Sequence, residues 1–150
     1  MEKIKIAFFE TEEWEKEYLK EGLEMAELSF FSEPLSHDNI HLAKSCQVVS
    51  PFIYSKIDKD ILQKLPDLKM ISTRSTGFDH IDTATAKGEK IIVCNVPFYG
   101  ENTVAEHTFA LILSLSRKLF DSVERARKGD FSLNGLRGFD LKDKFLGIIG

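Results

Sequence analysis

The chain has 150 residues, 43% of them hydrophobic, which is enough to bury one core of ordinary size and too few for two complete domains. Lysine and arginine number 20 against 24 aspartates and glutamates, so the net charge of −4 argues against a nucleic-acid binder that uses a basic surface. A small anionic substrate would therefore need a local site.

Apolar runs alternate with helical patterns along the first hundred residues. Strands are predicted at residues 4–9, 28–31, 46–50, 68–73 and 90–96. Helices are predicted after Thr11, which would act as the N-cap, and over residues 38–44, 58–65 and 79–87. The first helix would present Trp14, Tyr18 and Leu19 on one face. This alternation predicts an α/β fold with a flavodoxin-like, doubly wound parallel sheet of strand order 2-1-3-4-5.

The two cysteines, Cys46 and Cys94, are far apart in sequence and form no CxxC pair. We expect both to be buried and reduced, which suits a cytoplasmic protein, and we predict no metal site. The N-terminus alternates charged and apolar residues, unlike a signal peptide, and no apolar run is long enough to span a membrane.

Ligands of doubly wound sheets bind at the carboxyl ends of the strands, which here correspond to residues 10–11, 51–52, 74–77 and 97–99. The segment RSTG at 74–77 precedes a predicted helix, and Gly77 could let the backbone turn successive amides toward a carboxylate. Phe52 and Tyr99 could pack beside a small organic acid. The residues alone leave open a plain strand-to-helix turn, with ordinary loop packing for both rings.

The character of the sequence changes after Gly100. Thr103 and Glu106 fit a capping box, and the apolar pattern that follows predicts one long helix as far as Gly129, which we interpret as crossing between domains. Gly135 and Gly138 lie in a predicted loop. The apolar residues 146–149, followed by Gly150, indicate the start of a new strand.

Three blocks, STGFDHID, VPFYGENTVAEHTFALILSLSRKL and LKDKFLGIIG, together resemble the D-isomer-specific 2-hydroxyacid dehydrogenases, most of all the D-lactate dehydrogenase branch. The similarity covers essentially the whole chain. It implies that residues 1–100 are the N-terminal part of the substrate-binding domain, 101–129 the inter-domain helix, and 130–150 the start of a Rossmann domain. Gly150 would be the first glycine of the G-x-G-x-x-G fingerprint. Asp143 stands where many members have glycine.

The resemblance also assigns roles to individual residues. The backbone amides of Ser75, Thr76 and Gly77 would bind the substrate carboxylate, with Tyr99 near the substrate and Phe52 as a more variable aromatic contact. For the cofactor, Val104 would approach the nicotinamide side of the cleft and Gly150 would belong to the dinucleotide site.

The family's catalytic arginine, histidine and acid belong to later parts of a complete member, so no catalytic residue is assigned to this chain. Arg74 is expected to make a structural ion pair or hydrogen bond beside the loop. His107 is expected to be packed within its helix, and His80 to lie in the first turn of a helix.

The implied activity is reversible hydride transfer between NAD(H) and a small D-2-hydroxy or 2-oxo acid such as D-lactate or pyruvate, in a cytoplasmic homodimer without nucleic-acid or membrane partners. The 150 residues alone are expected to be inactive. NADP instead of NAD stays open, because the discriminating acid would lie beyond Gly150.

The sequence allows three other interpretations. A phosphorelay receiver would need an acidic cluster after the first strand and an aspartate after the third, where this chain has only Glu10 and then Ser50-Pro51. A non-enzymatic relative could keep the fold as a corepressor or dinucleotide sensor. The chain could also be a truncated gene product or an excerpt.

Overall fold

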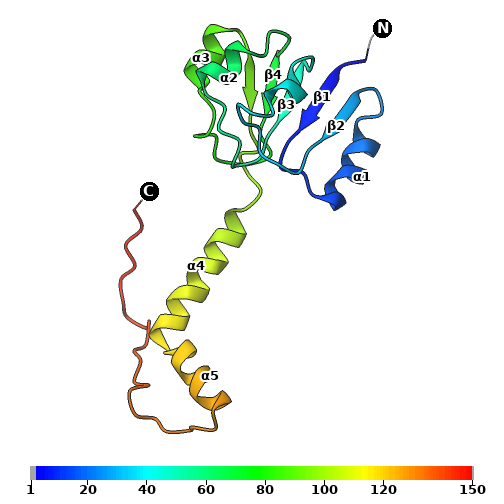
Figure 1. Cartoon of the computed structure of the whole chain (residues 1–150). Coiled ribbons are helices and arrows are strands. Elements are labelled where there is room, and N and C mark those ends of the chain that lie inside the picture. Colours follow the sequence, from blue (N-terminus) through cyan, green and yellow to red (C-terminus); the bar gives the residue numbers. More distant parts are fainter. Residues whose placement is uncertain (1–2, 150) are drawn as a thin grey trace. The chain divides into compact units, whose positions relative to one another are not determined.

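Five short strands form one parallel sheet in the first of two compact units, Met1–Tyr99 and Gly100–Gly150 (Figure 1). The computed structural model describes residues 3–149. The strands of the sheet are β1 (Lys5–Phe8), β2 (Glu27–Phe30), β3 (Val48–Ser50), β4 (Met70–Ser72) and β5 (Ile92–Cys94). Their order is β2-β1-β3-β4-β5, and every neighbouring pair is parallel. The predicted fold class is confirmed.

The sheet is apolar at its centre and more exposed at its edges. In the register, Ile6 of β1 pairs with Val48 of β3, and Val49 pairs with Ile71 of β4. Val49 and Ile71 are fully buried, whereas the edge strands β2 and β5 contain no fully buried residue. A strand between two others buries both of its faces more completely than an edge strand does, so the buried apolar residues of the sheet are concentrated in β1, β3 and β4.

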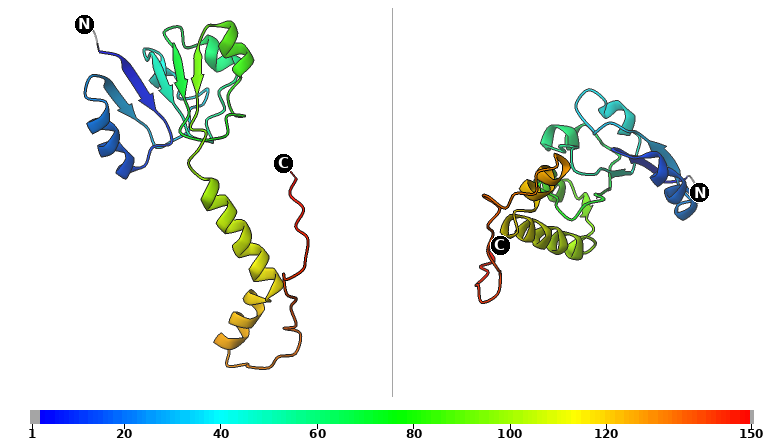
Figure 2. Two further views of the ribbon diagram at one scale, coloured as in Figure 1. Left: turned by 180° about the vertical axis from the view of Figure 1, so that it is seen from behind. Right: turned by 90° about the horizontal axis from the view of Figure 1, so that it is seen from below.

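Helices and one 3-10 turn connect the strands: α1 (Glu13–Gly22), η1 (Ile40–Ala43), α2 (Lys59–Gln63) and α3 (Thr83–Gly88). In Figures 1 and 2, α1 lies beside β2 at one side of the sheet, whereas α2 and α3 pack side by side near β4. Residues 38–44, predicted to be an α-helix, form only the short η1. The helix predicted over residues 58–65 forms as the shorter α2, and Asp58 is its N-cap, because its carboxylate accepts the N–H of Ile61 at 3.0 Å.

The N-cap predicted for α1 is wrong. The helix begins one residue later than expected, with Glu12 as N-cap, and the Glu12 N–H donates to the Glu15 carboxylate at 2.7 Å. Trp14 and Tyr18 are 72% and 77% exposed. The Glu15 side chain points inward instead, because it forms an ion pair with Arg74, which follows β4.

The helix predicted at residues 79–87 begins only at Thr83, so His80 precedes the helix. Asp82 is its N-cap and accepts from the N–H of Thr85 at 2.9 Å and from the Thr85 hydroxyl at 2.6 Å. Before the cap, Ile81 is held in an isolated parallel bridge with Ile57. That bridge keeps residues 78–82 out of the helix, because their backbone groups bond to a neighbouring segment.

The second unit contains two helices where one was predicted: α4 (Glu101–Ser116) and α5 (Leu119–Arg127). Gly100 is the N-cap of α4, so Thr103 lies inside the helix and forms no capping box. The helices are separated at Lys118, whose φ of 51° is left-handed. The Ser116 carbonyl accepts the N–H of Phe139 at 2.9 Å, so the returning chain bonds to the end of α4.

Two further expectations for this unit are not met. His107, predicted to be packed, is exposed on α4. Residues 146–149, predicted to be a strand, have no regular structure, because a strand forms only against a partner and none pairs with them here. Gly150 lies outside the described residues. Asp143 has a left-handed φ of 60°.

The burial of the cysteines and the length and polarity of the helices concern two further predictions made from the sequence. Both cysteines are free; Cys46 is buried as predicted, whereas Cys94 on β5 is only partly buried. Within residues 3–149, every helix is too short or too polar to reach across a bilayer.

The close approach at Gly138 yields a first prediction. A Cβ at this position would lie 2.0 Å from the Ser116 carbonyl oxygen, so backbone would have to move. Gly138→Ala should lower the free energy of unfolding of the second unit by about 1–3 kcal/mol, measured by chemical denaturation. The control is Gly147→Ala, where a Cβ meets nothing within 4 Å. Equal stability of both variants would contradict the packing described.

Candidate functional site

The loops that follow β1, β3, β4 and β5 meet at the carboxyl edge of the sheet. Backbone hydrogen bonds join them in sequence: the Phe9 N–H donates to the Ser50 carbonyl, the Arg74 N–H to the Pro51 carbonyl, and the Val96 N–H to the Ser75 carbonyl, each at 3.0 Å. The predicted ligand-binding loops therefore share one edge of the first unit.

The loop at residues 75–77 has engaged carbonyls and unengaged amides. The Ser75 carbonyl accepts from the Val96 N–H, the Thr76 carbonyl from the Asn95 side chain at 2.8 Å, and the Gly77 carbonyl from the Ser75 hydroxyl at 2.7 Å. Within residues 3–149, the three N–H groups of this loop donate to no protein acceptor. The loop therefore presents available backbone N–H donors, whereas its carbonyl oxygens are already hydrogen-bonded. This arrangement suits the binding of an anion.

The structure corrects two reasons given for this loop. Gly77 does not have a left-handed φ, and a Cβ there would meet only the Asp79 carboxylate, at 3.9 Å. Its conformational freedom is therefore not what the loop requires. The helix expected directly after the loop begins only at Thr83, so the amides would bind an anion without a helix N-terminus beside them.

A cavity of about 500 Å³ opens beside the loop. Gly77, Asp79 and His80 line it from one side, and Ile53, Tyr54 and Lys56 from the loop after β3. Phe52 precedes these residues and is half-buried, and its carbonyl accepts the Thr73 hydroxyl at 3.0 Å. The structure thus brings Phe52 and its loop to the segment that carries Ser75.

The remaining sequence-predicted residues are not joined to this loop by any interaction within the described part of the chain. Tyr99 is exposed and makes no hydrogen bond there, although its segment is tied to the loop through Asn95 and Val96. Val104 lies on α4 in the second unit and is 68% exposed. Gly150 lies outside the described residues. No group of three residues suited to a metal ion occurs in residues 3–149.

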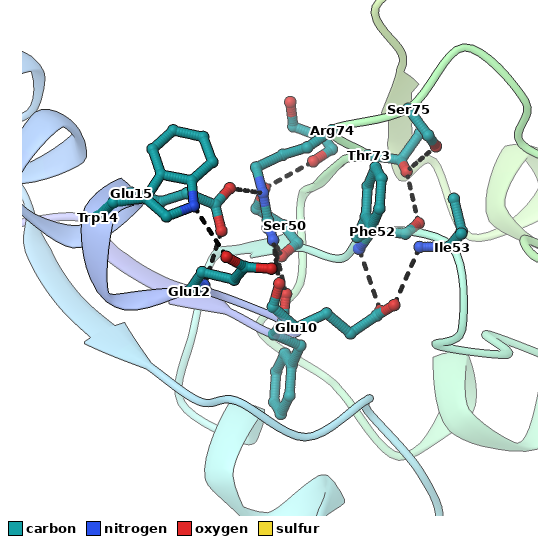
Figure 3. Close-up of polar contacts among 12 residues, drawn as sticks. Glu10, Glu12, Trp14, Glu15, Ser50, Phe52, Ile53, Thr73, Arg74 and Ser75 are labelled. Atoms are coloured by element: carbon teal, nitrogen blue, oxygen red, sulfur yellow. Dashed lines mark hydrogen bonds and ion pairs between the residues drawn. The ribbon is translucent and has the colours of Figure 1, made fainter. Parts of the chain in front are cut away.

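Arg74 has a structural role of the kind predicted from the sequence (Figure 3). Its guanidinium donates to the carbonyls of Phe9 and Glu10, both at 2.9 Å, and to that of Ser50 at 2.8 Å. Its Nε pairs with Glu15 at 3.2 Å, and both side chains are 18% exposed. These bonds join the ends of β1 and β3 to α1, and they leave no donor directed at the cavity.

His80 is linked to the loop through hydroxyl groups. Its Nε2 lies 3.2 Å from the Thr73 hydroxyl, which in turn lies 2.7 Å from the Ser75 hydroxyl. Burial lowers the pKa of His80 below its ordinary value of 6.5, outweighing the opposite effect of the charges on Glu10 and Asp79. A neutral imidazole with its proton on Nε2 can donate to the Thr73 oxygen, so that the Thr73 hydroxyl proton stays available to its other partners.

Glu10 is the residue that sequence reasoning missed. In the sequence it is a single acid after the first predicted strand, yet in the structure its carboxylate accepts from the amides of residues 52–55. A non-glycine residue with a φ of 57° was not visible in the sequence pattern. An isolated acid directly after a predicted strand was the only signal that could have singled it out.

Comparison with known proteins identifies the family. Residues 6–135 match the family described as D-isomer specific 2-hydroxyacid dehydrogenase, catalytic domain. The chain belongs to this family. The resemblance found in the sequence is thereby confirmed.

Relatives and solved structures agree with this membership. The 2-hydroxyacid dehydrogenase homolog 1 of Schizosaccharomyces pombe is 37% identical and the D-lactate dehydrogenase of Escherichia coli K12 is 32% identical; each alignment covers 98% of this chain and 46% of the relative. The crystal structure of D-lactate dehydrogenase from Aquifex aeolicus, complexed with NAD and lactic acid, matches with a TM-score of 0.85 at 34% identity, covering 91% of this chain and 41% of that one. The chain spans less than half the length of these proteins.

The contacts of Arg74 predict a large effect on stability. Arg74→Lys keeps the charge but cannot reach the carbonyls of both strands, so we expect the free energy of unfolding to fall by about 2–4 kcal/mol in chemical denaturation. Arg117→Lys is the matched control, because Arg117 makes only an exposed pair with Asp140. Similar losses for both variants would contradict the role of Arg74.

The lowered pKa of His80 predicts a pH dependence of stability. Below pH 6.5 the unfolded chain takes up a proton that the folded imidazole binds only at lower pH, so the free energy of unfolding should fall as the pH drops from 6.5 toward the folded pKa. His80→Gln should flatten this part of the curve, measured by denaturation between about pH 5 and 7.5. Parallel curves for the two proteins would count against the buried, neutral imidazole.

Proposed function

We propose that the protein carrying this chain is an NAD-dependent D-2-hydroxyacid dehydrogenase, which reduces a small 2-oxo acid such as pyruvate to the D-2-hydroxy acid and catalyses the reverse reaction. Family membership supports the class of reaction. The observation that carries the assignment to this chain is the loop at residues 75–77, whose carbonyls are all engaged while its amides are not.

The role of the first unit is to bind and orient the substrate. The amides of Ser75, Thr76 and Gly77 hold the carboxylate, Phe52 and Tyr99 contact the rest of the acid, and the cavity beside Gly77 has room for a small molecule. Fixing the carboxylate determines where the keto carbon lies, and such positioning removes much of the entropic barrier of a two-substrate reaction. No catalytic residue is assigned within these 150 residues.

Residues 1–100 are assigned to the substrate-binding domain, 101–129 to the inter-domain region and 130–150 to the start of the NAD-binding domain. NAD(H), when bound, supplies or accepts the hydride. Val104 fits a contact with the nicotinamide, because it presents an exposed aliphatic side chain on the first turn of α4. Gly150 is assigned to the dinucleotide site.

Assembly and location are further parts of the proposal. Besides Val104, four large apolar side chains of α4 are about half or more exposed, namely Phe109, Leu111, Leu113 and Leu115. Their exposure supports a homodimer in which a second copy covers this helix. The two free thiols support a reducing, cytoplasmic environment.

The proposal is tested by NADH oxidation with pyruvate and other small 2-oxo acids, using the purified full-length protein, together with chiral analysis of the product. We expect turnover and the D-isomer. The 150 residues alone should give none, because they include no assigned catalytic residue. A full-length protein that binds NADH but reduces no 2-oxo acid would overturn the enzymatic assignment in favour of a dinucleotide sensor.

Gly77 supplies a prediction within this experiment. Gly77→Val places a branched side chain in the open space beside Asp79, so the KM for the 2-oxo acid should rise about tenfold while the KM for NADH stays unchanged. Gly88→Val is the control, since a Cβ at Gly88 meets nothing within 4 Å and the residue lies at the end of α3. An unchanged KM for the 2-oxo acid in Gly77→Val would remove the loop from the substrate site.

A further inference from the structure

The carboxylate of Glu10 organises the loop that follows β3 (Figure 3). One oxygen accepts the amides of Ile53 at 3.0 Å and Tyr54 at 2.6 Å. The other accepts the amides of Phe52 and Ser55, both at 3.1 Å, and also the Ser55 hydroxyl. Four consecutive N–H groups thus converge on a single side chain more than forty residues away in sequence.

Glu10 is itself fixed from several directions. Its N–H donates to the Glu33 carbonyl at 3.2 Å, and its carbonyl accepts from the Arg74 guanidinium at 2.9 Å. Its φ of 57° is left-handed, a conformation that a non-glycine residue keeps only when its surroundings hold it there. The side chain is therefore aimed at the loop by its backbone.

The ionised form of Glu10 is the one that the loop stabilises. Burial raises the pKa of the carboxyl group, but the Ser55 hydroxyl and the amides of Tyr54, Phe52 and Ser55 lower it further than burial raises it. The net result is a pKa below the ordinary value of 4.5. The loop thus meets a full negative charge at neutral pH, and its four amides serve as the donors.

The loop held by Glu10 leads directly to the proposed substrate site. Ile53 and Tyr54 line the cavity together with Gly77 and His80. The Phe52 carbonyl accepts the hydroxyl of Thr73, which lies 2.7 Å from the Ser75 hydroxyl. A displacement of residues 52–55 would therefore change both the wall of the cavity and the support of the carboxylate-binding loop.

Glu10 also fills what would otherwise be a second anion site. Four convergent amides bind carboxylates readily, so an empty loop at residues 52–55 would compete for the substrate's own carboxylate. With Glu10 in place, the amides at residues 75–77 are the ones left for the substrate.

We propose that Glu10 is a positioning residue for the 2-oxo acid: its carboxylate fixes the loop at residues 52–55 in the conformation that forms one wall of the substrate cavity. This inference rests on the proposed function. It adds a residue whose role is exerted through the loop and not through contact with the substrate.

The test compares Glu10→Gln with wild type in the full-length protein. Glutamine keeps the shape of the side chain but replaces one acceptor oxygen with an amide donor that faces the loop's N–H groups. The KM for pyruvate should rise about tenfold, with kcat changed by less than about threefold and the KM for NADH unchanged. Hydrogen exchange at residues 52–55 should become faster, which reports the loop without relying on activity.

Two further variants keep the test decisive. Ser55→Ala removes one hydroxyl, which also accepts the Leu35 N–H at 2.9 Å, and leaves the four amides, so it should shift the KM for pyruvate in the same direction by about two- to threefold even if Glu10→Gln fails to fold. Glu13→Gln removes an exposed carboxylate of α1 that contacts only Lys16, and should behave as wild type.

The outcomes separate the two proposals. A wild-type protein that reduces no 2-oxo acid overturns the proposed function. An active wild type with an unchanged KM for pyruvate in Glu10→Gln and Ser55→Ala overturns the inference, as does a fall in kcat alone or unchanged exchange at residues 52–55.

Discussion

The bonds of one guanidinium hold together the edge of the sheet at which the site lies. Parallel strands end with carbonyl groups that the ladder no longer satisfies, and after β1 those of Phe9 and Glu10 are bound by Arg74, which also donates to the Ser50 carbonyl at the end of β3. The fork of an arginine can serve several acceptors at once, whereas a lysine would provide a single point of charge. The same group draws Glu15 inward, which explains why α1 turns a carboxylate, and not Trp14 or Tyr18, toward the sheet.

Two neighbouring loops at this edge show the same donor-rich backbone with opposite outcomes. The amides of residues 52–55 are satisfied internally by Glu10, while those of residues 75–77 find no acceptor within the described part of the chain. The loops are joined through the hydroxyl of Thr73, which reaches the Phe52 carbonyl and lies beside Ser75. A loop whose amides are bound by Glu10 thus lies beside a loop whose amides are available. This arrangement is suited to holding a small carboxylate in a single orientation.

The second unit differs in kind from the first. Its α4 is rich in apolar side chains that stay exposed, and its last residues, 146–149, form no strand. The described elements of this unit supply neither a strand that could pair with residues 146–149 nor a surface that covers the apolar side chains of α4. Asp143 has a left-handed φ, a conformation that non-glycine residues adopt rarely.

The sequence by itself determined the five strands, their order and the family, because alternating apolar runs and local motifs carry that information within short windows. It also predicted a helix that starts at Asp58, where the structure has a local N-cap interaction. Only the tertiary structure decided the start of α3, the inner face of α1 and the break at Lys118, since each depends on a contact made elsewhere in the chain. The role of Glu10 could not be predicted from the sequence for the same reason. Its carboxylate binds amides more than forty residues away, and backbone N–H groups leave no trace in the identity of the residues that bear them.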